Sequence, residues 1–146
     1  MIVYLDSSAV VKCYIPEAGW EETLELVSAA ELVATSPITR VEVASGLARA
    51  VRTGSLSADT GRGALRAFAE ESHALIQIPM TERLLVRAQG LVWEHGLRGY
   101  DAVQLASAVT WRERVGRPVT LATFDRRLWQ AGAAAGLEPW PAVMAA

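Results

Sequence analysis

The chain has 146 residues, a length that suits one domain with a real hydrophobic core and leaves little room for two. Apolar residues make up 51% of it and charged residues 21%, a globular composition that excludes a disordered chain. The formal net charge of −2 excludes a uniformly basic nucleic-acid binder, so that binding a nucleic acid would require a local cluster of arginines or a metal ion.

The cysteine and histidine content and the hydropathy pattern limit the kind of metal site and the cellular location that we expect. Cys13 is the only cysteine, which excludes an intrachain disulfide and a thiolate metal cluster, and His73 and His95 are not spaced as a ligand pair. A metal ion would therefore be held by oxygen, which favours Mg²⁺ or Mn²⁺ over structural zinc. No apolar run approaches the ~20 residues of a spanning helix, and Asp6 interrupts the N-terminal apolar stretch. We therefore expect a cytoplasmic protein without a membrane segment or a secretory signal.

Short apolar runs alternate with helical patterns along the chain. In chain order, the expected elements are a strand at Ile2 to Leu5, a helix that opens after Asp6, a helix from about Trp20 to Ala30, a strand at Leu32 to Thr35, a helix that begins at Pro37 and ends before Thr53, a helix from Ser57 to Glu71, a strand at Ala74 to Ile78, helices from Thr81 to Glu94 and from Tyr100 to about Glu113, a strand at Val119 to Thr123, and a last helix that Asp125 opens. Because proline lacks the ladder donor, the tail around Pro139 is expected to be at most a short edge strand.

Helical spacing also indicates which side chains share a face. The apolar stripe of the helix that begins at Pro37 consists of Ile38, Val41, Ala44, Leu47, Ala48 and Val51. Trp93 and Trp111 lie within helical patterns, so we expect both in the core. Thr81 is the expected N-cap of its helix.

Strands that alternate with helices predict an α/β fold, a three-layer α/β/α sandwich with a mostly parallel central sheet, in a single domain of residues 1–146. In an open parallel sheet, ligands bind outside the carboxyl ends of the strands. Asp6 directly follows the first strand and Asp125 the last main strand, while Asp101 sits in the first turn of its helix. We therefore expect Asp6 and Asp125 at the functional edge.

Each acid also has a purely structural interpretation. An Asp between strand and helix is commonly an N-cap, an Asp in a first turn interacts with the helix dipole, and Glu42 could be a solvated residue or pair with Arg49. In combination, Asp6, Glu42 and the other two acids would repel one another at neutral pH, and either a proton or a divalent metal must relieve that repulsion. A hard cation in such a site orients and polarises a phosphodiester, which points to phosphoryl transfer to water.

Four segments resemble, in order, the acidic motifs of PIN-domain nucleases and, more narrowly, of VapC-type toxins of bacterial toxin–antitoxin pairs. They are Ile2 to Ser8, Thr39 to Ala44, Arg98 to Ala108, and Thr123 to Leu128, and together they span nearly the whole chain. Some family members have a further acid after the fourth motif, whereas Arg126 and Arg127 stand there in this sequence.

The resemblance implies an RNA endonuclease that uses Mg²⁺ or Mn²⁺ and is held inactive by a cognate antitoxin. Because small family members tend to pair, a homodimer is also expected. By motif position, the metal-binding and catalytic acids would be Asp6, Glu42, Asp101 and Asp125. By motif position, Ser7 or Ser8 and Thr123 would either support the acids or orient and bind the substrate. The arginines that adjoin the motifs and could bind the RNA backbone are Arg40, Arg98 and Arg126. For the arginines, the alternative is a solvated helix charge.

Other functional classes fit less well. A receiver-type phosphoacceptor requires a lysine late in the chain, but Lys12 is the only lysine. An aspartyl-phosphate hydrolase usually has a second Asp two residues after the nucleophile, where Ser8 stands here. A DNA-directed flap nuclease would need additional segments. The remaining alternative is a catalytically silent PIN-like module that binds RNA or protein.

Overall fold

The computed structural model describes residues 1–145. Within them, five strands form one sheet in the order β3-β2-β1-β4-β5. The central strand β1 (Ile2–Leu5) pairs in parallel with β2 (Leu32–Thr35) and with β4 (Thr120–Ala122), and the outer strands are β3 (Ile76–Gln77) and β5 (Glu138–Trp140). Because all pairings are parallel, the carboxyl ends of the strands meet at one edge.

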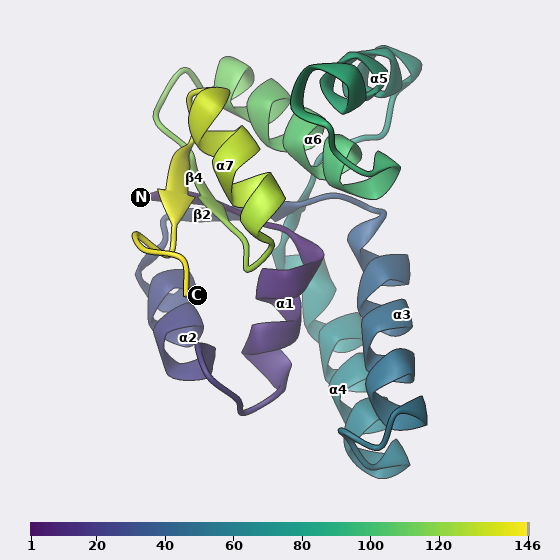
Figure 1. The fold of residues 1–146 in the computed structure, drawn as a ribbon. Helices are drawn as coiled ribbons and strands as arrows, with labels where there is room; N and C mark the ends of the chain where they lie inside the picture. Colours follow the sequence, from purple (N-terminus) through teal and green to yellow (C-terminus); the bar gives the residue numbers. More distant parts are fainter. Residues whose placement is uncertain (146) are drawn as a thin grey trace.

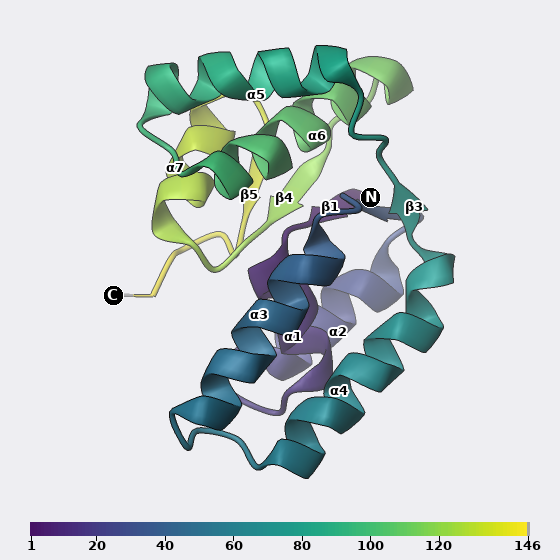
Figure 2. The same ribbon diagram turned by 90° about the vertical axis from the view of Figure 1, so that its right-hand side faces the viewer.

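Helices cover both faces of the sheet (Figures 1 and 2). One layer contains α1 (Ser7–Tyr14), α2 (Trp20–Ala29), α3 (Thr39–Arg52) and α4 (Ala58–Glu71). The other layer contains α5 (Glu82–His95), α6 (Gly99–Val115) and α7 (Arg126–Ala134). The predicted α/β/α sandwich with its parallel sheet is therefore confirmed. No helix of residues 1–145 combines the length and the apolar character that crossing a bilayer requires.

Two apolar clusters lie on opposite faces of the sheet, and the side chains of β1 alternate between them. Ile2 and Tyr4 pack into the cluster that also contains buried residues of α5, α6 and α7. Val3 and Leu5 pack into the cluster of α1 to α4. A strand covered on both faces needs apolar side chains at every position, which explains why its sequence is a continuous apolar run.

Two boundaries differ from the prediction. The expected strand at residues 74–78 is reduced to Ile76–Gln77, because a 3₁₀ turn at Ser72–Ala74 precedes it and Pro79 follows it closely. The helix expected from Pro37 begins at Thr39. The short edge strand expected near Pro139 is confirmed as β5.

One predicted core position, Trp93, was wrong, and one member of the apolar stripe of α3, Val41, is exposed for the same reason. Trp93 is 87% exposed, because α5 buries Leu84 and Ala88 and Trp93 lies half a turn away from them. Val41 is 63% exposed, because α3 turns Thr39, Val43 and Leu47 toward the core instead. The predicted burial of Trp111 and the predicted cap are confirmed: Trp111 is 5% exposed, and the hydroxyl of Thr81 accepts a hydrogen bond from the amide of Leu84 at 3.1 Å.

Candidate active site

Asp6 and Asp125 lie at the same edge of the sheet, where adjacent strands β1 and β4 end. Both carboxylates are also N-caps. Asp6 Oδ1 accepts a hydrogen bond from the amide of Ala9 at 3.0 Å, and Asp125 Oδ1 accepts one from the amide of Leu128 at 2.9 Å. The capping role that the sequence allowed is therefore present, and it fixes each carboxylate where a strand gives way to a helix.

The carboxylate of Asp6 is buried, with 3% of the residue exposed, and it accepts hydrogen bonds from neighbouring hydroxyls as well as from its cap. Ser8 Oγ donates to Oδ1 at 2.7 Å, and Thr123 Oγ1 donates to Oδ2 at 2.7 Å. The amide of Asp125 donates to Thr123 Oγ1 at 3.0 Å, so one hydroxyl links the two acids. Burial raises the pKa of Asp6 to about 6, the charge of Glu42 adds to the rise, and the hydrogen bonds oppose it.

The other acids line one pocket of about 350 Å³, which we call the acid pocket. Glu42 comes from the first turn of α3, Asp101 from the first turn of α6, and Asp125 from the cap of α7. Three helix N-termini thus meet at the pocket, and their partial positive charges favour anionic side chains. Its lining residues are Ser7, Val41, Glu42, Ser45, Gly46, Arg49, Arg98, Tyr100, Asp101 and Asp125. Asp6 is not among them, and it is buried at the same edge.

Negative charge accumulates in the acid pocket. The pKa of Asp101 is raised to about 6, first by burial and then by the charges of Asp125 and Glu42, while Arg98 opposes the rise. Burial also raises the pKa of Glu42, and the side chains of Gln104 and Ser7 oppose this. The charges of Asp125 and Glu42 thus act on Asp101, a repulsion that a cation between these carboxylates would relieve.

Gln104 positions Glu42, and the sequence reasoning missed it. Its side chain is buried, and Nε2 donates to Glu42 Oε1 at 2.7 Å and to Thr39 Oγ1 at 2.9 Å. Its Oε1 accepts a hydrogen bond from the hydroxyl of Tyr4 at 2.6 Å. The available signal was a glutamine one helical turn after Asp101, inside a run of otherwise small or apolar residues.

The donor set of the acid pocket fits a hard divalent cation, because carboxylate oxygens are the ligands that Mg²⁺ and Mn²⁺ prefer. The pocket offers the carboxylates of Glu42, Asp101 and Asp125 and no thiol or imidazole. Within residues 1–145, however, no three Asp, Glu, His or Cys side chains stand close enough together to form a ready-made metal cluster. The ligands match in chemistry, and they are not closed into a coordination shell.

The residues expected to bind substrate are placed differently from one another. Ser7 and Arg98 line the acid pocket. Ser8 and Thr123 hold Asp6 instead, as described above. Arg126 is directed to the tail, where its Nη2 donates to the carbonyl of Ala145 at 2.7 Å.

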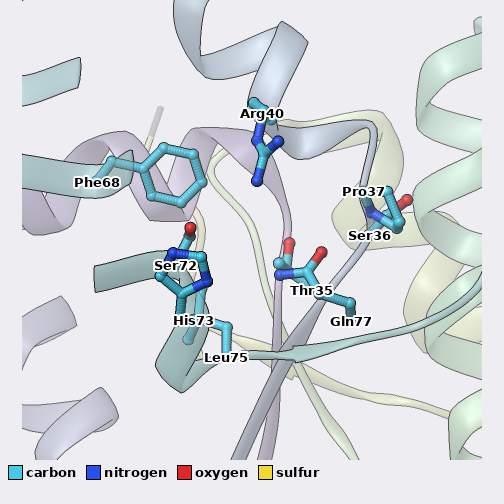
Figure 3. A pocket seen from close by; sticks show the side chains of 9 residues that line it. All are labelled: Thr35, Ser36, Pro37, Arg40, Phe68, Ser72, His73, Leu75 and Gln77. Carbon is cyan, nitrogen blue, oxygen red and sulfur yellow. The ribbon is translucent and has the colours of Figure 1, made fainter. Parts of the chain in front are cut away.

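Arg40 does not line the acid pocket. It lines a second pocket together with Phe68, His73 and Gln77 (Figure 3). In an α-helix, residues two apart point roughly 200° away from each other, so Arg40 and Glu42 face different sides of α3.

Two further side chains that the sequence reasoning did not select stand at the acid pocket. Tyr100 lines it and is 60% exposed, which leaves an aromatic ring accessible at its rim. Arg49 lines it from α3, two turns after Glu42. The signals were the position of Tyr100 directly before Asp101 and the heptad spacing of Arg49 from Glu42.

Comparison with known proteins gives consistent matches. The family model described as PIN domain matches residues 3–133. Ribonuclease VapC49 of Mycobacterium tuberculosis is 34% identical over 142 residues, which cover 97% of this chain and 96% of the relative. Ribonuclease VapC3 of Pyrobaculum aerophilum is 32% identical over 128 residues, which cover 88% of this chain and 92% of the relative.

A solved structure described as a toxin–antitoxin complex from Klebsiella pneumoniae contains a chain that matches this fold with a TM-score of 0.61 at 19% identity, over 84% of this chain and 86% of that one. At that identity the likeness establishes the fold alone. The family model and the sequence relatives carry the assignment further, since they span most of the chain. The chain belongs to the PIN-domain family and, within it, to the VapC-type proteins.

Proposed function

We propose that this chain is a divalent-metal-dependent endoribonuclease that hydrolyses RNA phosphodiesters, and that it is the toxin of a toxin–antitoxin pair. One observation carries the proposal: Glu42, Asp101 and Asp125, which are far apart in the sequence, line one pocket, and Asp6 is buried at the same edge. The names of the relatives, Ribonuclease VapC49 and Ribonuclease VapC3, support RNA as the substrate.

In this proposal, Glu42, Asp101 and Asp125 hold Mg²⁺ or Mn²⁺, and Asp6 is the fourth acid, buried at the same edge of the sheet. When bound, the cation neutralises phosphate charge and activates water for attack on phosphorus. Arg98 stands beside Asp101 and offers a positive charge to a phosphate oxygen, and the hydroxyl of Ser7 offers a donor in the same pocket.

Buried neighbours keep these acids in place before substrate arrives. Gln104 fixes the carboxylate of Glu42, and the hydroxyls of Ser8 and Thr123 fix that of Asp6. Side chains held by packing and hydrogen bonds lose little conformational freedom on binding, which favours accurate positioning of the reacting groups.

The antitoxin is the proposed protein partner. The matched Klebsiella pneumoniae structure is described as a toxin–antitoxin complex, which supports a partner of this class. A homodimer and a cytoplasmic location stay predictions from the sequence.

The decisive experiment is incubation of the purified protein with total RNA in the presence of Mg²⁺, of Mn²⁺, or of a chelator. Cleavage should require one of the metals, and an Asp101→Asn variant purified in parallel should not cleave, because Asn keeps the shape of the side chain and loses the charge. This variant also controls for a contaminating nuclease, which would survive the substitution. RNA binding without cleavage under both metals would contradict the proposal and favour the catalytically silent PIN-like module.

Thermal melting gives a second readout that does not depend on activity. A divalent cation at ten times its dissociation constant stabilises the fold by about 1.4 kcal/mol, or roughly 3–5 °C for a domain of this size. Asp101→Asn should reduce this shift. An unchanged melting temperature of the parent protein with either metal would contradict the metal site.

A further inference from the structure

The second pocket, which we call the Arg40 pocket, has a volume of about 330 Å³ and lies between the first turn of α3 and the carboxyl-terminal end of α4 (Figure 3). The guanidinium of Arg40, the imidazole of His73 and the amide of Gln77 surround its centre, and the edge of the Phe68 ring forms part of its wall. Among the described residues that line it, none is Asp or Glu. A cavity that offers cationic and neutral donors and no carboxylate suits an anion.

Arg40 has no ion-pair partner among the residues that the structure describes. None of the ion pairs found within residues 1–145 involves it, whereas Arg87 and Arg117 each pair with a glutamate at less than 3 Å. The Arg40 side chain is nevertheless directed into the pocket and not away from the protein. The planar fork of an arginine that lines a cavity is well shaped for the oxygens of a phosphate.

The Arg40 pocket and the acid pocket are separated only by the first turn of α3. Arg40 lines the former, and the next two residues, Val41 and Glu42, line the latter. Thr35 and Gln77, at the ends of β2 and β3, place the Arg40 pocket at the same carboxyl edge of the sheet. A helix is about 10–12 Å across, a distance that a few nucleotides of a single strand bridge.

We propose that the Arg40 pocket binds a phosphate of the same RNA strand that is cut in the acid pocket. The strand would cross the first turn of α3 over Val41, which is 63% exposed. This inference rests on the proposed ribonuclease function and extends it, because it gives the RNA strand a path across the protein surface and a minimum length. It also gives Arg40 a role away from the reacting phosphate.

The test measures binding of labelled oligouridylates by fluorescence anisotropy over a series of KCl concentrations in Mg²⁺, with Asp101→Asn as the background so that cleavage does not interfere. For a strand of roughly six nucleotides, Arg40→Gln should weaken binding roughly tenfold. It should also reduce the slope of log affinity against log salt by about 0.7, the contribution of one phosphate contact in a single strand. Arg40→Lys should keep the slope.

Two controls separate a pocket effect from a general one. Arg66→Gln removes an exposed charge on α4 that lines neither pocket, and it should leave the slope unchanged. Gln77→Glu places a carboxylate in the Arg40 pocket, and it should weaken binding of the longer strand as Arg40→Gln does. With a diuridylate, too short to bridge the helix, Arg40→Gln and its parent should bind alike.

An unchanged salt slope for Arg40→Gln with the longer strand would overturn the inference, as would an equal loss of affinity for both lengths. Because binding is measured without cleavage, these results are separate from a failure of the ribonuclease proposal. That proposal would instead fail in the incubation with total RNA.

Discussion

Replacing Gln104 with leucine should test whether the buried glutamine connects the hydrophobic core to the active site. The change removes hydrogen bonds to three partners, which are Tyr4, Thr39 and Glu42. Thr39 keeps a hydroxyl partner in Thr35 at 2.7 Å, and Glu42 is half-buried and reaches water. The hydroxyl of Tyr4, whose residue is 0% exposed, loses the acceptor of its 2.6 Å hydrogen bond inside the core, and the hydroxyls of Ser107 and Ser36 stay as its polar neighbours.

The size of the effect follows from these environments. Removing the acceptor of a buried hydroxyl costs up to about 1–3 kcal/mol, and the loss of the other hydrogen bonds adds to this, so Gln104→Leu should destabilise the fold by about 2–4 kcal/mol. For a domain of this size, that lowers the melting temperature by about 6–12 °C. Cleavage should fall further than the stability loss explains at temperatures where the variant is folded, because Glu42 is no longer held.

A double-mutant cycle with Tyr4→Phe isolates the central hydrogen bond. Tyr4→Phe alone leaves Gln104 Oε1 without its donor, whereas the double variant leaves neither group stranded. Urea unfolding of the four proteins should therefore show a double variant that is more stable than the sum of the two single losses predicts, by about 1–2 kcal/mol. Losses that add to within 0.5 kcal/mol would refute the reasoning, because independent sites show about that agreement.

Three further predictions concern charge, packing and substrate contact. The pKa of Asp101 is raised from 3.8 to about 6 in the folded protein, so the ionised carboxylate destabilises the fold at pH 7. Without metal, Asp101→Asn should therefore be more stable than the parent in urea unfolding at pH 7, by roughly 1 kcal/mol after a discount for solvent screening. This gain should disappear as the pH falls through 6 toward 4. Gly132→Ala should lower the melting temperature, since the new Cβ would overlap Leu121, whereas Gly90→Ala, with no neighbour within 4 Å, should raise it; the opposite order would contradict the packing of α7 on β4. Tyr100→Ala should weaken RNA binding by about 1–3 kcal/mol and Tyr100→Phe should not, if the exposed ring stacks on a base; equal affinities of all three proteins would exclude stacking.

The sequence predicted the position of the acids better than their surroundings. That Asp6 and Asp125 lie at one edge follows from topology, since both come after parallel strands. Whether they cap helices or serve a site was posed as an alternative, and the structure shows that capping does not exclude convergence: the cap bonds of both acids are present, and Asp125 lines the acid pocket.

The errors arose where periodicity had to be converted into burial. A helical repeat shows which residues share a face, but it does not show which face the neighbouring elements cover. Trp93 belonged to a helical pattern and faces outward because α6 packs against the Leu84 side of α5. Closeness in sequence has a similar limit: Arg40 is two residues from Glu42 and lines another pocket, because residues two apart diverge around the helix, and its role in substrate binding stays a prediction.

Gln104 was missed for a different reason. The sequence around a polar residue in a buried run does not indicate its hydrogen-bond partners. Here the partners come from β1 and α3, 100 positions away for Tyr4 and 62 for Glu42. Such long-range pairings depend on how α6 crosses the sheet, which the sequence pattern of one helix does not encode.

Because of the order of the strands in the sheet, the active site can form only late in the synthesis of the chain. β1 is synthesised before the other four strands of the sheet, yet it occupies the centre of the sheet and pairs with β4. The hydrogen bond from Thr123 to Asp6 joins residues 117 positions apart, a closure that has to wait for nearly the whole chain. A nascent chain that has not reached Thr120 therefore lacks β4, the hydroxyl that holds Asp6, and Asp125. A copy whose synthesis stops before Asp125 therefore lacks an acid of the pocket, and the site can assemble only after that residue has been added.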